Sequence, residues 1–246
     1  WKIDSNLRAY IEGAYQRNMR LAFRVVVDSR DKRTEFTPQF VKDAGAKGFM
    51  NKGKWSPYSD DSVFQKYYTK FVKALAKDFN DPSKVEFIDG FGLGKWGEYH
   101  TMIYSTGDDT PKKAVFDWVT DIYSQAFDKV PVVINYHRWI GAGKDWVDDE
   151  HFAADSEEML EDAIKKGYSL RHDAFGMTTY YGSWERRFAK KYRNICPIIM
   201  EGGWIVKSHS YWQDPRGYRK DSHEDVRRGE FDDSKEAHVN MMDFRF

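Results

Sequence analysis

The chain has 246 residues, with 39 lysine plus arginine and 39 aspartate plus glutamate, so its formal net charge at pH 7 is zero. This balance excludes the strongly basic surface of nucleic-acid-binding domains. No stretch approaches the roughly 20 apolar residues of a membrane-spanning helix. The length suits one large domain, and a 17% share of aromatic residues favours aromatic side chains that line a groove.

The first third of the chain predicts two clear helices and one strand. An amphipathic helix is expected over residues 6–20, followed by a buried strand over Leu21–Val27. Residues 30–62 are polar and irregular, with a short helix expected near Pro38–Lys42. The clearest helix is Phe64–Phe79, where apolar side chains recur at helical spacing and form one stripe.

From residue 85 onward, short apolar strands alternate with helices. The expected strands are Val85–Ile88, Val130–Tyr136, Tyr168–Thr179, Cys196–Glu201 and Val239–Phe244. The expected helices between them are 115–126, Ser156–Lys166, Trp184–Tyr192 and Ser222–Ala237. This alternation predicts a parallel sheet with helices outside it.

Two α/β architectures fit this pattern. A doubly wound open sheet would need a phosphate-binding glycine turn, and the glycines of 90–94 are a poor match to one. Six parallel strands left open would also expose two edges. We therefore expect a (β/α)8 TIM-type barrel, a single catalytic domain over residues 1–246 that holds strands 3 to 8 and lacks its first two strands.

Two stretches share one pattern, VEFIDGFGLGKWGEYH at 85–100 and CPIIMEGGW at 196–204. Each has an apolar strand, then glycines, a tryptophan and a glutamate, Glu98 in the first and Glu201 in the second. Cleavage of a glycosidic bond needs one protonated carboxyl group and one ionised carboxyl group. The pair therefore predicts a glycosidase, with Glu98 beside aromatic side chains as the acid/base.

This order of elements resembles the retaining glycoside hydrolases of the (β/α)8 clan that includes β-galactosidases, β-glycanases and agarases. The resemblance implies that Glu98, after strand 4, is the acid/base and that Glu201, after strand 7, is the nucleophile. We expect the two side chains to face each other across one cleft, with carboxyl groups roughly 5–5.5 Å apart. The clan usually has asparagine before the acid/base, where this chain has Gly97.

The resemblance also implies an oligo- or polysaccharide substrate and no cofactor, and it favours a secreted, periplasmic or cell-surface location. The residues expected to bind substrate are Trp96, Tyr99, His100, Asn135, His137, Trp139, Tyr180, Tyr181 and Trp204. Tyr180 and Tyr181 are the candidates to orient Glu201, with ordinary packing as the alternative. Sugar, linkage, endo or exo action and oligomeric state are not indicated.

Charged residues inside apolar strands need partners. Arg24 is expected to pair with Asp89 or Glu201, and Arg171 with Asp173. No His-x-x-x-His pattern or cysteine pair is present, so no metal is assigned. Two other functions stay open: a non-catalytic carbohydrate-binding barrel, and a metal-dependent hydrolase that uses aspartate and histidine at strand ends.

Overall fold

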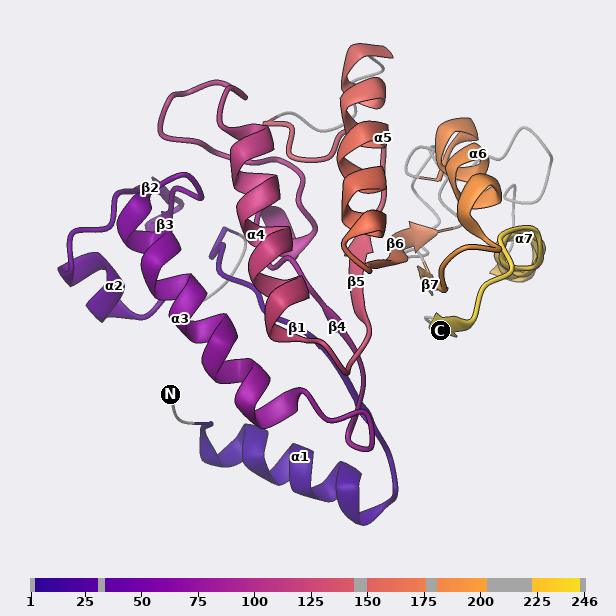
Figure 1. Ribbon diagram of the computed structural model, residues 1–246, viewed down its shortest axis with the longest axis horizontal. Coiled ribbons are helices and arrows are strands. Elements are labelled where there is room, and N and C mark those ends of the chain that lie inside the picture. The colour runs from indigo at the N-terminus through magenta and orange to yellow at the C-terminus, as the bar shows by residue number, and fades with distance from the viewer. Residues whose placement is uncertain (1–2, 31–33, 144–149, 176–180, 203–222, 244–246) are drawn as a thin grey trace. The chain divides into compact units, whose positions relative to one another are not determined.

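The computed structural model describes residues 3–30, 34–143, 150–175, 181–202 and 223–243 (Figure 1). The chain divides into two compact units. The first comprises Trp1–Val133 and Gly141–Lys144, and the second comprises Ile134–Ile140 and Asp145–Phe246. The boundary falls within strand β5 (Val132–Asn135), so each unit contains part of that strand.

The first unit contains four helices and a short 3-10 turn among its described residues. The helices are α1 (Ser5–Gln16), α2 (Gln39–Asp43), α3 (Ser62–Phe79) and α4 (Lys112–Ala126), and the 3-10 turn is η1 (Lys95–Gly97). Besides its part of β5, the strands are β1 (Leu21–Arg24), β2 (Gly48–Asn51), β3 (Lys54–Pro57) and β4 (Val85–Asp89). Each helix predicted in this region is present.

Strand β4 lies between β1 and β5 and pairs parallel with both. Arg24 is opposite Asp89 in the β1–β4 register, and Asp89 is opposite Val133 in the β4–β5 register. The carboxyl ends of β1 and β4 therefore meet, which brings the basic and the acidic side chain to the same edge.

Helix α3 supplies the main apolar layer of the first unit. Asp61 caps its start, because its carboxylate accepts a hydrogen bond of 2.9 Å from the backbone N–H of Phe64. The predicted stripe is confirmed by five buried side chains, Phe64, Tyr68, Val72, Leu75 and Phe79. Two members of that stripe, Tyr67 and Phe71, are only half-buried and line an apolar cavity of about 610 Å³.

Two features of the first unit differ from the prediction. The amphipathic helix expected over residues 6–20 is present as α1, which ends earlier, at Gln16; none of its side chains is buried, and Tyr10 is 80% exposed. The irregular stretch 30–62 contains an antiparallel hairpin of β2 and β3. Lys52 and Gly53 form its turn, both with positive φ (49° and 74°), as tight hairpins prefer.

The second unit continues the alternation of strand and helix. Its helices are α5 (Glu150–Lys165), α6 (Ser183–Tyr192) and α7 (His223–Glu236), and its other strands are β6 (Ser169–Phe175), β7 (Ile198–Gly202) and β8 (Met241–Asp243). Strands β6 and β7 pair parallel, as do β7 and β8. The backbone N–H of Tyr136, just past β5, donates to the carbonyl of Arg171 on β6 at 2.8 Å.

The strand order is β1-β4-β5-β6-β7-β8, so the predicted six parallel strands with intervening helices are confirmed. A complete eight-stranded barrel is not shown by the described residues, because β2 and β3 form a separate two-stranded sheet. In the described part of the chain, no helix is both long enough and apolar enough to cross a membrane.

Candidate active site

The loop that follows β4 has an unusual backbone. Trp96, Tyr99 and Thr101 all have positive φ, at 57°, 61° and 49°. Such a conformation costs of the order of 1–3 kcal/mol for each non-glycine residue and is typical of functional sites. Two backbone hydrogen bonds of 3.0 Å close the loop, from Lys95 N–H to the His100 carbonyl and from Tyr99 N–H to the Leu93 carbonyl.

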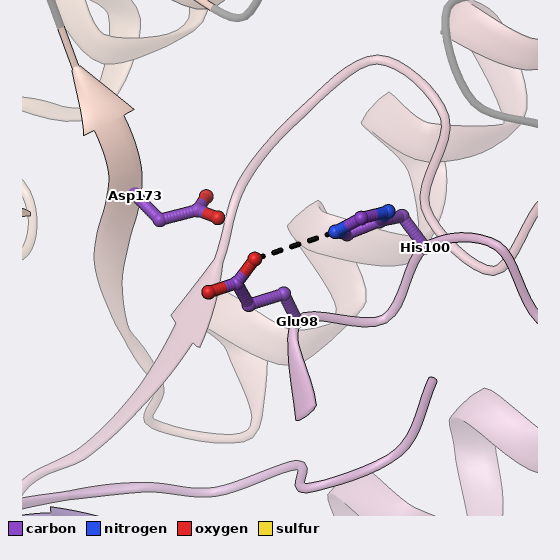
Figure 2. A group of neighbouring side chains, drawn as sticks. All are labelled: Glu98, His100 and Asp173. Carbon is purple, nitrogen blue, oxygen red and sulfur yellow. Dashed lines mark hydrogen bonds and ion pairs between the residues drawn. The ribbon is translucent and has the colours of Figure 1, made fainter. Parts of the chain in front are cut away.

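The loop places Glu98 between a cation and an imidazole. Its side chain is buried, and Oε1 accepts a hydrogen bond of 2.7 Å from Arg24 Nη1. Its Oε2 lies 3.3 Å from His100 Nε2, the contact marked by the dashed line in Figure 2. Both oxygens of this carboxyl group therefore have defined partners.

Arg24 serves two carboxylates at once. Its Nε donates to Asp89 Oδ2 at 2.7 Å while its Nη1 donates to Glu98. The predicted pairing of Arg24 with Asp89 is confirmed. The sequence did not reveal the pairing with Glu98, because it depends on the loop conformation. Since Asp89 shares the guanidinium, the positive charge of Arg24 is divided between the two acids.

Gly97 lies directly against the Arg24 side chain. Its φ is +77°, and a Cβ at this position would lie 3.0 Å from Arg24 Cδ and 3.1 Å from the Val25 carbonyl oxygen. A side chain here would combine backbone strain with a steric conflict. The close approach of the Arg24 side chain therefore explains why a glycine occupies position 97, where the (β/α)8 clan that the sequence resembles usually has asparagine.

Trp96 and Tyr99 flank Glu98 in sequence but differ in exposure. Trp96 is 38% exposed, and Lys95 Nζ lies 4.3 Å from the centroid of its ring. Tyr99 is fully buried, and its hydroxyl donates to the Lys112 carbonyl at 3.1 Å. Burial raises the pKa of the Tyr99 hydroxyl well above its usual value. The Tyr99 side chain packs in the first unit, so we leave it out of the substrate-contact set.

In the second unit, Glu201 lies near the end of β7 and forms an ion pair with Arg171 of the adjacent strand β6. Its side chain is 19% exposed and that of Arg171 is 7% exposed. Arg171 was expected to pair with Asp173. An ion pair joins Arg171 to Glu201, so the guanidinium stabilises the carboxylate form of the predicted nucleophile.

The carboxyl ends of β5 and β6 carry further polar side chains. Asn135 is buried, and its Oδ1 accepts a hydrogen bond of 3.2 Å from the backbone N–H of Asp173. The Asp173 carboxylate, on β6, is drawn in Figure 2. His137 is also buried, with its ring centroid 5.4 Å from that of Trp139. Trp139 is fully buried and is left out of the substrate-contact set.

A buried ion pair that was not predicted fixes the segment after β5. Glu185 of α6 is fully buried, and its carboxylate accepts hydrogen bonds from Arg138 Nη1 and from the backbone N–H groups of Arg138 and Gly182. Burial raises the pKa of Glu185, while Arg138 and the N–H donors oppose that rise. The pair ties residues 137–139 to the start of α6. A carboxylate in the first helical turn was the available sequence signal.

Tyr181 joins an aromatic cluster. Its hydroxyl lies 3.4 Å from the Tyr136 hydroxyl, and its ring lies edge-on to His172 with centroids 4.9 Å apart. Burial raises the pKa of both tyrosines. These contacts are those of a packing residue, the alternative foreseen for it. The other two predicted substrate residues, Tyr180 and Trp204, lie outside the described residues.

Comparison with known proteins gave a likeness of fold. No protein-family model matches the sequence, and no curated protein matches it either. Three similar solved structures are of endo-glycoceramidase II from Rhodococcus sp., in complex with a cellobiose-like imidazole, a cellobiose-like isofagomine and a five-membered iminocyclitol.

Their TM-scores are 0.50, 0.50 and 0.51, with sequence identities of 11%, 10% and 10%. The likeness covers 99% of this chain in each case but only 61%, 61% and 60% of the similar chains. This chain therefore spans about three-fifths of their length. At such identity the likeness establishes a shared fold.

Proposed function

We propose that this chain carries the catalytic residues of a glycoside hydrolase that cleaves an oligo- or polysaccharide by a two-carboxylate retaining mechanism. One observation carries the proposal. Glu98 follows the parallel strand β4 and Glu201 lies near the end of the parallel strand β7. Each is ion-paired to an arginine of the neighbouring strand, Arg24 for the first and Arg171 for the second. The fold shared with endo-glycoceramidase II supports it.

The surroundings of the two glutamates suit different roles. Glu201, held by Arg171, is the nucleophile that attacks the anomeric carbon. Glu98 is buried and is the acid/base: it first protonates the leaving oxygen and then takes a proton from the water that releases the sugar. Because Asp89 shares Arg24, the cation does not act on Glu98 alone, which suits a carboxyl group that must hold and release a proton.

Aromatic and polar side chains at the strand ends of the two units would supply substrate contacts. Trp96 is exposed in the same loop, and an exposed indole face can stack on a sugar ring. Two of the similar structures are complexes with cellobiose-like ligands, so aryl β-cellobiosides belong in the first substrate panel. Asn135, His137 and His100 remain in the proposed set as buried polar groups.

Activity measurements on the two glutamates test the proposal. Glu201→Gln should abolish turnover of every substrate while leaving the circular dichroism spectrum unchanged. Glu98→Gln should lower turnover of an oligosaccharide by about 10²–10⁴-fold, with a much smaller loss on aryl glycosides whose leaving group needs no proton. Glu86→Gln is the matched control, because Glu86 lies on β4 with its side chain 40% exposed, in an ion pair with Arg20.

Other results would favour the alternative functions. Binding of oligosaccharides without turnover of any glycoside in the wild type would support a carbohydrate-binding barrel. Activity that is lost with a chelator and restored by a divalent metal would support a metal-dependent hydrolase. Equal effects of Glu86→Gln and Glu201→Gln on turnover would contradict the assigned nucleophile.

A further inference from the structure

A series of hydrogen bonds in the first unit connects Glu98 to a buried ion pair. His100 Nε2 lies 3.3 Å from Glu98 Oε2, and His100 Nδ1 lies 2.9 Å from Thr101 Oγ1. The backbone carbonyl of Thr101 accepts a hydrogen bond of 2.5 Å from Arg30 Nη2. Arg30 in turn ion-pairs with Asp28 at 2.6 Å. The imidazole beside Glu98 is thus held at both of its nitrogens.

The ion pair of Arg30 and Asp28 is buried and is held by further hydrogen bonds. Arg30 and Asp28 are each 8% exposed, and Asp28 also accepts hydrogen bonds from the Arg30 backbone N–H at 2.9 Å and from Ser56 Oγ of β3 at 3.4 Å. Breaking a buried pair leaves an uncompensated charge, so both members are constrained. The pair therefore gives the Thr101 carbonyl a fixed donor.

The backbone conformation of Thr101 requires contacts that hold it, and the hydrogen bond from Arg30 is one of them. Its φ of 49° is a genuine outlier for a β-branched residue, and surrounding contacts must hold a backbone of this kind in place. The hydrogen bond from Arg30 fixes the Thr101 carbonyl, and with it the position of the hydroxyl that faces His100. This explains why a threonine can occupy the strained position.

The Thr101 hydroxyl can either donate or accept a hydrogen bond. When it donates to Nδ1, the imidazole proton is on Nε2 and faces a Glu98 carboxylate. When it accepts from Nδ1, Nε2 carries a lone pair and accepts the proton of a Glu98 carboxylic acid. A general acid/base passes through both of these forms during one retaining turnover.

We propose that Thr101 and Arg30 are positioning residues for Glu98, which hold His100 so that its imidazole partners Glu98 in both protonation states. The inference rests on the proposed function, because it assigns a role relative to the acid/base. Among the described residues of the first unit, the charged and titratable groups that face Glu98 include Arg24 of β1 and His100 of its own loop, with Asp89 of β4 acting through Arg24.

Nitrogen NMR of the His100 ring tests the positioning role without any need for activity. In the wild type both neutral tautomers should contribute to the ring nitrogen shifts. In Thr101→Val the Nδ1 atom loses the Thr101 hydroxyl, and the share of the tautomer with its proton on Nε2, where Glu98 accepts it, should increase. Thr106→Val is the matched control, because the Thr106 hydroxyl bonds the Asp108 carbonyl on the exposed surface. Identical nitrogen shifts in Thr101→Val and wild type would overturn the proposal.

The pH profile of kcat/KM provides the second readout. A proton fixed on Nε2 stabilises the Glu98 carboxylate, so Thr101→Val should move the alkaline limb to lower pH by roughly one unit. Arg30→Met should produce a shift in the same direction, and Arg30→Lys should restore part of the wild-type profile. An unshifted limb in active Thr101→Val would overturn the proposal even if Arg30→Met failed to fold. If the wild type turns over no glycoside, the proposed function fails and the tautomer measurement alone decides the positioning role.

Discussion

His172 is a fully buried imidazole on β6, set edge-on between the rings of Tyr136 and Tyr181 with centroids 5.0 Å and 4.9 Å away. Burial lowers the pKa of His172 from 6.5 to about 4. Asp173 opposes this effect and Arg171 adds to it. At neutral pH the folded protein therefore keeps this ring uncharged.

This buried histidine predicts a loss of stability in mild acid. As pH falls below about 6.5 the unfolded chain binds a proton at this site, whereas the folded chain does not until about pH 4. The free energy of unfolding should therefore decrease across this window, by on the order of 3 kcal/mol in total. Urea unfolding at a series of pH values measures it.

His172→Phe should make the free energy of unfolding less dependent on pH in this window. The variant keeps an aromatic ring at this position but has no group that can bind a proton. His238→Gln is the control, since His238 is an exposed histidine of the same unit, and it should leave the slope as in the wild type. A His172→Phe profile as steep as that of the wild type would contradict the assignment.

Sequence alone could predict some partners of single residues but not others. Arg24 lies within an apolar run, so a buried counter-charge was required, and Asp89 on the next strand of the sheet was an available one. Its second partner, Glu98, depends on a loop with three non-glycine residues at positive φ. Backbone propensity disfavours that conformation, so no local rule could have led to it.

At the scale of elements, helix α3 allows a direct test of packing. Leu75 is 2% exposed on its buried face, so Leu75→Ala should lower the free energy of unfolding by about 2–5 kcal/mol. Phe71 is half-buried and borders the apolar cavity, so Phe71→Ala should cost less than the full burial of its ring would imply. Chemical denaturation followed by tryptophan fluorescence measures both.

Lys73→Ala is the control on the exposed face of the same helix, and a change within about 0.5 kcal/mol is expected. A loss for Leu75→Ala no larger than that for Lys73→Ala would mean that this stripe does not stabilise the first unit.

Elements with strong periodicity were predictable, and short ones without it were not. Helices α3, α4 and α6 each have an apolar face several turns long, which sets both their existence and their buried side. The β2–β3 hairpin has four residues in each strand, too few for period-two alternation to stand out. Helix α1 shows that an amphipathic pattern predicts a helix without predicting what covers its apolar face.

At the scale of the whole molecule, the sequence predicted the sheet more fully than it predicted the site. Buried parallel strands read as single apolar runs, so six could be counted and placed in order. No pattern in the sequence predicted the division into two units that share β5. The fold is shared with endo-glycoceramidase II at only 10–11% sequence identity. The reason is that alternating burial constrains the type of residue at each position, whereas the particular amino acid can change.

The stereochemistry of the reaction tests the proposed mechanism of the whole molecule. Two carboxyl groups roughly 5–5.5 Å apart allow direct attack and give a product with the anomeric configuration of the substrate, whereas a spacing of about 6.5–9.5 Å admits a water and inverts it. The nucleophilic role proposed for Glu201, which is ion-paired to Arg171 near a strand end, predicts retention. Proton NMR of the first sugar released from an aryl β-glycoside, recorded before mutarotation, should show the β-anomer. Release of the α-anomer would leave Glu201 as the base that activates water and would replace the retaining mechanism by an inverting one.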